Sequence, residues 1–218
     1  MRSERQAIDS GRFLEGRRFR LPLDQGALIM GVLNVTPDSF YDGGNFLEPE
    51  RAVAKGLELV FQGADILDIG GESSRPGSDP ISAEEELRRI LPVIRHLVRE
   101  IDIPISVDTY KAHVARAALE EGVDIINDIS GLQFDPPLAQ VAAAFEALIV
   151  VMHTSGRPKR MQEEAQYGDL ISEIIASLKD SIRRGMEAGI ALEKFVVDPG
   201  IGFGKTTLDN LRILRELE

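Results

Sequence analysis

Short apolar runs alternate with amphipathic stretches over most of the chain, and this alternation predicts its fold. Six apolar runs stand out, and the first of them, 27–33, is continuous, which is typical of a parallel strand that is buried on both faces. Each run is followed by a stretch that predicts a helix. No hairpin signal separates these units, so the pattern predicts parallel strands joined by right-handed crossovers. The predicted strands cover 27–33, 64–69, 104–107, 123–126, 147–152 and 195–197.

Caps and apolar faces place the helices between these strands. Pro49 lies near the start of the first helix, where proline is tolerated. Ser82 and Glu85 form a capping box, so the second helix is predicted from there to about Glu100. Thr206 begins the last helix. Three helices have a predicted buried apolar face. In the first helix this face is Val53, Leu57, Val60 and Phe61, and in the second it is Leu87, Ile90, Leu91, Ile94, Leu97 and Val98. In the helix that precedes the sixth strand it is Ile171, Ile174, Ile175, Leu178, Ile182 and Met186.

Two closures are compatible with repeated strand–helix units: an open doubly wound sheet and a TIM-type (β/α)8 barrel. We favour the barrel because it gathers all strand ends around one mouth, whereas the glycine fingerprint of the open dinucleotide-binding sheet is missing after the first strand. A barrel has eight units, so the chain is predicted to hold about six of them, the first three-quarters. The polar residues that follow the strands are Asn34, Glu72, Asp108, Asn127, His153 and Asp198.

The barrel domain is predicted to cover residues 28–218, preceded by an extension over residues 1–27. In that extension Phe19, Leu21 and Leu23 alternate with polar residues or proline. This alternation predicts a short strand or a lid over the floor of the barrel.

Composition narrows the class of protein. The chain of 218 residues has a formal net charge of −11, which argues against a nucleic-acid groove or an anionic membrane surface. It contains no cysteine, so disulfides and thiolate metal sites are excluded. No apolar run reaches the roughly 20 residues of a membrane helix, and residues 1–27 are too charged for a signal peptide. We therefore expect a soluble protein of a reduced compartment, the cytoplasm.

The segment from Asp198 to Lys205, DPGIGFGK, is the first candidate for ligand binding. It is not a phosphate-binding P-loop, because Pro199 occupies the position of the first required glycine. Its three glycines let the backbone approach a flat ligand closely. The alternative is a tight turn between strand and helix. We favour ligand contact, because Phe203 is expected to be exposed among these glycines.

Asp108 and Asp198 each follow an apolar strand, and each alone is as well explained as a helix cap. A carboxylate also accepts two parallel N–H bonds from an aminopyrimidinone edge. Their expected convergence at one mouth with the amides of Asn34 and Asn127 favours binding. Asn34 becomes a reasonable Mg²⁺ ligand only if a phosphorylated substrate supplies the rest of the coordination shell.

Other polar residues have simpler explanations. Ser73 and Ser74 are compatible with turn chemistry, although Arg75 suits bidentate contact with a phosphate or carboxylate. His153 has no second ligand at zinc spacing, which favours a structural, hydrogen-bonded histidine. Lys111, Arg116 and the charges between residues 84 and 99 are predicted to lie on solvated helix faces.

Taken together, six motifs resemble the dihydropteroate synthase family. The resemblance is specific, because the first two loops and the last motif are long, and it extends over residues 28–218 in the family's order. The motifs are LNVTPDSFYDGG (33–44), DIGGESSRPG (68–77), SVDT (106–109), INDISG (126–131), the VMH of the fifth strand and DPGIGFGK (198–205).

The resemblance implies an enzyme of folate synthesis that condenses 6-hydroxymethyl-7,8-dihydropterin diphosphate with 4-aminobenzoate, releases diphosphate and uses Mg²⁺. It also implies a homodimer. By motif, Asp108, Asn127 and Asp198 would be the catalytic residues and hold the pterin edge, and Asn34 would bind the Mg²⁺–diphosphate. Ser74 and Arg75 would lie in a mobile second loop; Ile129, Met152, Gly202 and Phe203 would border the substrate pockets.

The chain departs from the family pattern in two ways. Ser74 stands where many members have threonine, which keeps the hydroxyl. The family's late Ser-Arg-Lys segment and its Arg-x-His have no counterpart before Glu218, so we expect a C-terminally truncated, poor catalyst. Two alternatives stay open: a pterin-binding methyltransferase domain, and a non-catalytic barrel that binds pterin. The first makes no use of Asn34 and the Ser74–Arg75 pair.

Overall fold

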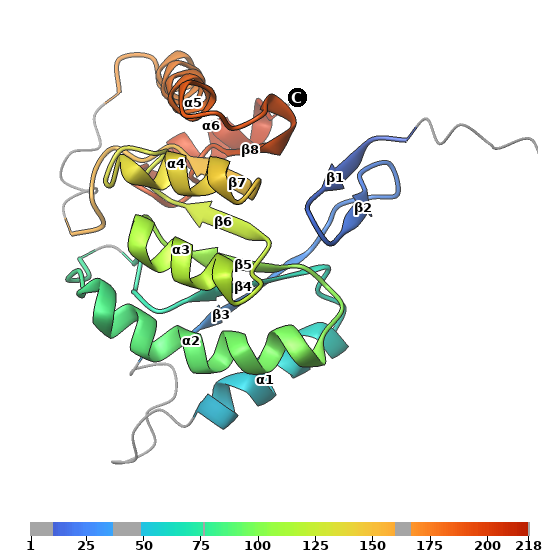
Figure 1. The fold of residues 1–218 in the computed structure, drawn as a ribbon. Helices are drawn as coiled ribbons and strands as arrows, with labels where there is room; N and C mark the ends of the chain where they lie inside the picture. Colours follow the sequence, from blue (N-terminus) through green and yellow to red (C-terminus); the bar gives the residue numbers. More distant parts are fainter. Residues whose placement is uncertain (1–10, 37–48, 76, 160–166, 218) are drawn as a thin grey trace, which may run out of the picture.

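The computed structural model describes residues 11–36, 49–75, 77–159 and 167–217. Its centre is a six-stranded parallel sheet whose strands are neighbours in chain order (Figure 1). The six predicted strands are therefore confirmed, with ends shifted by a few residues. They are β3 (Met30–Asn34), β4 (Ile66–Gly70), β5 (Ile105–Asp108), β6 (Ile125–Asp128), β7 (Leu148–Met152) and β8 (Phe195–Asp198).

A helix follows each strand, and successive helices from α1 to α5 contact one another beside the sheet (Figure 1). Thr206 begins α6 with a complete capping box to Asp209, as the sequence predicts for the start of this helix. Ser82 accepts a hydrogen bond from the Glu85 amide at the start of α2. The helices are α1 (Pro49–Phe61), α2 (Ala83–Glu100), α3 (Ala112–Glu120), α4 (Pro137–Ala144), α5 (Leu170–Glu187) and α6 (Thr207–Arg215), with a short 3-10 helix, η2 (Leu192–Lys194).

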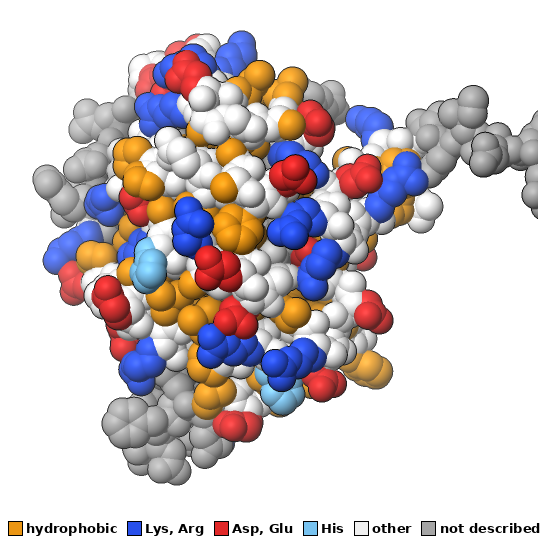
Figure 2. All heavy atoms as spheres, in the orientation of Figure 1, with side chains coloured by type: hydrophobic (Ala, Val, Ile, Leu, Met, Phe, Trp, Pro, Cys, Tyr) orange, Lys and Arg blue, Asp and Glu red, His pale blue; other side chains and the backbone are white. Residues whose placement is uncertain are grey.

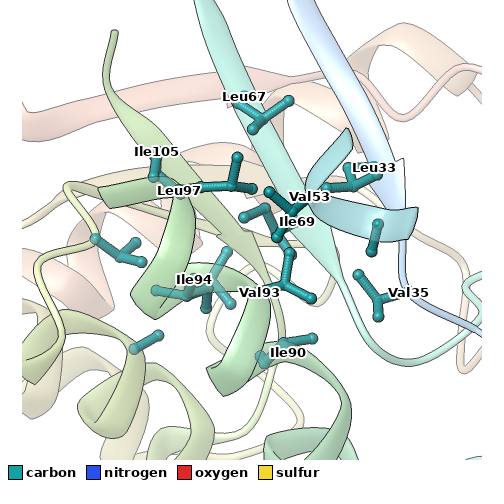
Figure 3. Packing of buried hydrophobic residues seen from close by; sticks show 14 of the residues in the cluster. Leu33, Val35, Val53, Leu67, Ile69, Ile90, Val93, Ile94, Leu97 and Ile105 are labelled. Carbon is teal, nitrogen blue, oxygen red and sulfur yellow. The ribbon is translucent and has the colours of Figure 1, made fainter. Parts of the chain in front are cut away.

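The main core lies between the sheet and its helices. One cluster joins β3, β4 and β5 to α1 and α2, with Leu67, Ile69 and Leu97 fully buried at its centre (Figure 3). A second cluster joins β6 and β7 to α3 and α4. Because side chains alternate along a strand, the residues between these positions point to the opposite face of the sheet. That opposite face carries the candidate site.

A β-hairpin packs against the beginnings of the strands. It consists of β1 (Phe13–Glu15) and β2 (Arg20–Pro22), and its apolar side chains contact Ile66, Ile125 and Leu148 on the site-bearing face. The Arg18 guanidinium pairs with Asp124 at 2.8 Å and also donates to the Gly122 carbonyl oxygen. The predicted short strand is thus present. Its partner β1 carries no alternation long enough to be recognised in the sequence.

Two helices are rotated from their predicted orientation. On α1, Leu57 and Phe61 are exposed, Phe61 by 93%, whereas Ala52, Val53 and Gly56 are buried. A side chain at Gly56 would lie only 3.0 Å from Leu97, so the glycine permits close packing there. Val53 is buried as predicted, but the prediction was wrong for Leu57 and Phe61, because small residues rather than the largest apolar ones set the contact.

On α5 the prediction is confirmed for Ile174, which is buried, and for Ile171 and Leu178, which pack against the same cluster, but it was wrong for two other residues. Ile175 and Met186 are exposed, and Ser181 and Gly185 are buried. A side chain at Gly185 would lie 2.4 Å from the Phe195 ring, so only glycine admits this approach.

The outer surface carries both signs of charge. Lysine, arginine, aspartate and glutamate side chains are interspersed over the helical face (Figure 2). Among the described residues, no helix is long and apolar enough to cross a membrane.

Candidate active site

The sheet brings several predicted site residues to the ends of neighbouring strands. Asn34 pairs with Gly70, Gly70 with Asp108, and Asp108 with Asn127. The residues just before them, Leu33, Val107 and Ile126, pack against helices. By alternation, the three polar side chains lie on the opposite, inner face.

Gly70 creates the space between two of these side chains. A Cβ atom on Gly70 would lie 3.4 Å from Asp108 Oδ2 and 3.8 Å from Asn34 Oδ1. The amide oxygen of Asn34 and the carboxylate of Asp108 therefore face the same gap above this glycine. Any side chain at position 70 would partly fill that gap.

Asp68 belongs to the same layer, and our reasoning from the sequence missed it. Asn127 Nδ2 donates to Asp68 Oδ2 at 3.0 Å, and Ser106 is its neighbour on β5. Burial raises the pKa of Asp68. Its second oxygen has no hydrogen-bond partner among the described residues. A carboxylate inside the apolar run ILDIG was the signal that could have identified it.

Asp108 is surrounded by other carboxylates. Burial raises its pKa well above the usual 3.8, and the negative charges of Asp68 and Glu86 act in the same direction. A group in this environment has a strong electrostatic preference for hydrogen-bond donors and positive charge. Asp108 lines a small pocket together with Ser74 and Ile129, two further predicted site residues.

A buried ion cluster stands beside this pocket. Lys111 Nζ lies 2.6 Å from Glu72 and also contacts Glu86, which is only 1% exposed. Glu72 accepts a further hydrogen bond from the Tyr110 hydroxyl at 2.8 Å. The prediction that Lys111 and Glu86 lie on solvated faces was therefore wrong. The periodicity of α2 cannot reveal that Lys111, at the start of α3, contacts Glu86. Arg116 is exposed, as predicted.

The second loop follows β4 and is tied to its neighbours. Arg75 is exposed, and Ser74 is half-buried. The Gly77 amide donates to the Pro158 carbonyl oxygen at 3.0 Å, which connects this loop to the one after β7. We predict that residues 73–79 and 36–46 are less ordered than the strands when no ligand is bound; the second range lies almost entirely outside the described residues.

The loop after β8 is shaped by glycine. The Gly200 amide donates to Asp198 Oδ1 at 2.7 Å. Gly200 has a φ of 72°, and a Cβ atom there would lie 2.0 Å from the His153 carbonyl oxygen. Only glycine therefore fits at this position. Gly202, further along the loop, is exposed.

Phe203 is half-buried, so the prediction that it is exposed among the glycines was wrong. It packs against Tyr110, Ile129 and Met152 in an apolar cluster that also includes Phe134. These side chains come from the ends of different strands. Together they form an apolar wall beside the polar residues on β5 and β6.

His153, directly after β7, is buried. Burial lowers its pKa to about 4, and the nearby charge of Lys205 acts in the same direction. Its Nδ1 atom has no hydrogen-bond partner in the described part of the chain.

The described residues contain no group of three histidine or acidic side chains positioned to hold a metal ion. The donors that face the mouth are nonetheless hard oxygen atoms, the amide of Asn34 and the carboxylate of Asp108. Such donors suit Mg²⁺ when phosphate oxygens complete the shell.

Comparison with known proteins assigns the family. The pterin-binding enzyme family matches residues 30–218. The chain belongs to this family. It is 44% identical to the dihydropteroate synthase of Bacillus subtilis, over 97% of this chain and 72% of that protein. It is 47% identical to the synthase of Synechocystis sp., over 87% of this chain and 65% of that protein.

A solved structure agrees with this family assignment. The dihydropteroate synthase of Xanthomonas albilineans with 4-aminobenzoic acid matches 95% of this chain and 73% of its own, with 42% identity and a TM-score of 0.87. The predicted (β/α) barrel class is confirmed, and the parallel sheet forms part of such a barrel. The chain spans about two thirds of the length of the curated relatives it matches.

Proposed function

We propose that this chain carries the pterin site of a dihydropteroate synthase. The enzyme would condense 6-hydroxymethyl-7,8-dihydropterin diphosphate with 4-aminobenzoate to give 7,8-dihydropteroate and diphosphate. The observation that carries this proposal is the identity of 44% and 47% to synthases, in a chain whose polar strand-end residues line one face of the sheet. Cytoplasmic location and a homodimer are further proposals; light scattering of the purified protein tests the second.

Recognition of the pterin ring would fall to the polar residues at the strand ends. The ring presents an amino group and ring N–H groups, which are donors, beside a carbonyl acceptor. Asp108 and Asp198 would accept the N–H bonds as carboxylates, each such bond being worth about 1.5–3 kcal/mol. Asn127 donates one amide hydrogen to Asp68, which fixes its orientation and leaves its oxygen for the ligand.

The reaction breaks the bond between the pterin methylene carbon and the diphosphate oxygen. The amine of 4-aminobenzoate forms the new C–N bond and loses a proton, and the diphosphate leaves with the electron pair of the C–O bond. Positive charge develops on the pterin methylene carbon as the leaving group departs. The carboxylates around Asp108 would stabilise this charge electrostatically.

Asn34, at the end of β3, would contribute its amide oxygen to a Mg²⁺ ion held mainly by the diphosphate oxygens. When bound, Mg²⁺ would offset the negative charge of the leaving group. Ser74 and Arg75, in the loop after β4, would contact the anionic parts of the substrates. Ile129, Met152, Gly202 and Phe203 would border the flat rings, since three of the four belong to one apolar cluster.

The test is turnover with the two substrates. The 218-residue chain is incubated with the pterin diphosphate, 4-aminobenzoate and Mg²⁺, and dihydropteroate is measured by chromatography. Pterin binding is measured in parallel by calorimetry. We expect pterin binding and slow product formation, both lost in the variant Asp108→Asn. Binding with no product at all would favour the non-catalytic barrel, and methyl transfer from a reduced folate would favour the methyltransferase.

A further inference from the structure

Lys205, the last residue of the DPGIGFGK segment, has no role in the function proposed above. It is 4% exposed, and no other lysine or arginine among the described residues is buried. Its Nζ atom donates to the Phe203 carbonyl oxygen at 2.9 Å and to the His153 carbonyl oxygen at 3.3 Å. The side chain thus reaches from the start of α6 back to the ends of two strands.

These bonds connect the end of β7 to the loop after β8. His153 directly follows Met152, and Phe203 lies in the same apolar cluster as Met152. The connection is reinforced by the His153 amide, which donates to the Asp198 carbonyl oxygen at 3.0 Å. Lys205 therefore holds together the two segments that carry Met152, Asp198 and Phe203.

Gly200 lies inside this connection. A Cβ atom on Gly200 would be 3.1 Å from Lys205 Nζ, and the Gly200 amide donates to Asp198 Oδ1 at 2.7 Å. The lysine, the glycine and the Asp198 carboxylate are thus packed in sequence. A shift of the ammonium group would displace the glycine and, through it, the carboxylate.

Burying an ammonium group to join two loops costs free energy. Within the described residues no carboxylate forms a salt bridge with Lys205, and its hydrogen-bond partners are neutral carbonyl oxygens. Burial lowers the pKa of Lys205 to about 8, which reflects this cost. An apolar side chain of similar length would be cheaper to bury, so the ammonium group serves something other than stability.

We propose that Lys205 is a positioning residue of the pterin site. Its ammonium group fixes the distance between the end of β7 and the Phe203 loop, and so holds Asp198 and Phe203 in the arrangement that receives the ring. The need for such a tie is greatest here, because among the described residues β8 pairs with β7 alone. This inference rests on the proposed function, since it assigns the residue to the pterin site.

The test compares Lys205→Met and Lys205→Arg with the control Lys179→Met. Lys179 lies on the exposed side of α5, so its replacement controls for the loss of one positive charge. The dissociation constant of the pterin diphosphate is measured by calorimetry, and amide hydrogen exchange of residues 199–205 is measured without ligand. We expect Lys205→Met to weaken pterin binding about tenfold or more and to accelerate exchange in this loop.

The possible outcomes distinguish a failure of the Lys205 inference from a failure of the proposed function. Lys205→Arg retains donors and should recover part of the affinity, which a merely space-filling role would not predict. Unchanged affinity and unchanged exchange in Lys205→Met would overturn the inference while leaving the proposed function intact. A wild-type chain that binds no pterin would instead contradict the proposed function, and with it the assignment of Lys205 to that site. Faster exchange with unchanged pterin affinity in Lys205→Met would also overturn the inference that Lys205 positions the pterin site.

Discussion

The centre of the sheet and its two edges differ in how completely their apolar side chains are covered. Every residue of β4 and β7 is buried. At the edges, by contrast, Val32 on β3 is 56% exposed and Val197 on β8 is 50% exposed. The helices beside the edge strands also expose large apolar side chains. On α1, beside β3, Leu57 and Phe61 are exposed. On α6 or just after it, Leu208, Leu211, Leu214 and Leu217 are exposed.

This difference shows that the sequence of a strand specifies its apolar character, whereas the burial of its side chains depends on the neighbouring strands. The run that contains β3 is as continuously apolar as the run that contains β7, which is typical of burial on both faces. Among the described residues, however, β3 and β8 each pair with a strand on one side only. Sheet edges of this kind expose unpaired backbone groups and are prone to association. We therefore expect the centre to carry most of the stability.

The largest effect is expected from matched leucine truncations at the centre and the edge. Leu67→Ala removes a side chain that is fully buried and should lower the free energy of unfolding by about 2–5 kcal/mol. Leu211→Ala removes one that is 58% exposed and should change it by about 0.5 kcal/mol or less. Urea unfolding measures both. Equal losses would mean that the edge is covered in solution and would contradict the comparison.

The next largest effect concerns ligand binding at the edge strand β8. Asp198→Asn should weaken pterin binding by about 10- to 100-fold, because a neutral amide cannot accept both parallel N–H bonds. The affinity for 4-aminobenzoate should change far less. Calorimetry with each ligand measures this selectivity. Asp102→Asn, at an exposed position between α2 and β5, is the control, and an unchanged pterin affinity in Asp198→Asn would refute the assigned role.

The pH dependence of stability probes His153, which lies where the centre meets the edge. The unfolded chain protonates this histidine below about pH 6.5, whereas the folded chain does so only near pH 4. The unfolded state therefore binds more protons in this window, and stability should fall as the pH drops from 6.5 to 4, by about 2–3 kcal/mol. His153→Gln should flatten this slope, while the exposed His113→Gln should retain it. Parallel slopes in the three proteins would count against the burial of His153.

The smallest effect is expected at Asp108, on the central strand β5. Burial and neighbouring carboxylates raise its pKa, so its ionised form is unfavourable in the folded state and stability is lost as the pH rises above about 4. Asp108→Asn should remove this loss and stabilise the fold at pH 7 by about 1 kcal/mol, while it abolishes pterin binding. A variant that is less stable at pH 7 would show that the carboxylate supports the fold.

The sequence predicted the fold well where the pattern was local. Apolar runs located the six strands, and the residues after them, such as Asp108 and Asn127, are neighbours in the sheet. Asn34 and Asp108 were expected at one mouth, and they face the same gap above Gly70. Motif resemblance supplied the family, which neither composition nor periodicity could identify.

The predictions that failed depended on packing between elements distant in the sequence. Leu57 and Phe61 are exposed because Gly56 lets α1 approach Leu97 closely, a contact that helical periodicity cannot reveal. Lys111 is half-buried, not on a solvated face, because Glu72 and Glu86 converge on it from two other segments. The Lys205 connection depends on carbonyl oxygens, which every residue has, so no side-chain pattern could identify it.

The central claim is our proposal that the strand ends of this sheet form a pterin site, in a sheet whose outer strands β3 and β8 each pair with a single strand among the described residues. The direct test is a chimera in which the C-terminal part of the Bacillus subtilis relative, beyond the matched region, follows residue 218. Dihydropteroate formation and the thermal midpoint are measured for the chimera and for the 218-residue chain. We predict a higher midpoint and a rate about 100-fold greater or more in the chimera, because added strands cover β3 and β8 and added cationic groups assist the departing diphosphate. Equal activity and equal stability would contradict the claim.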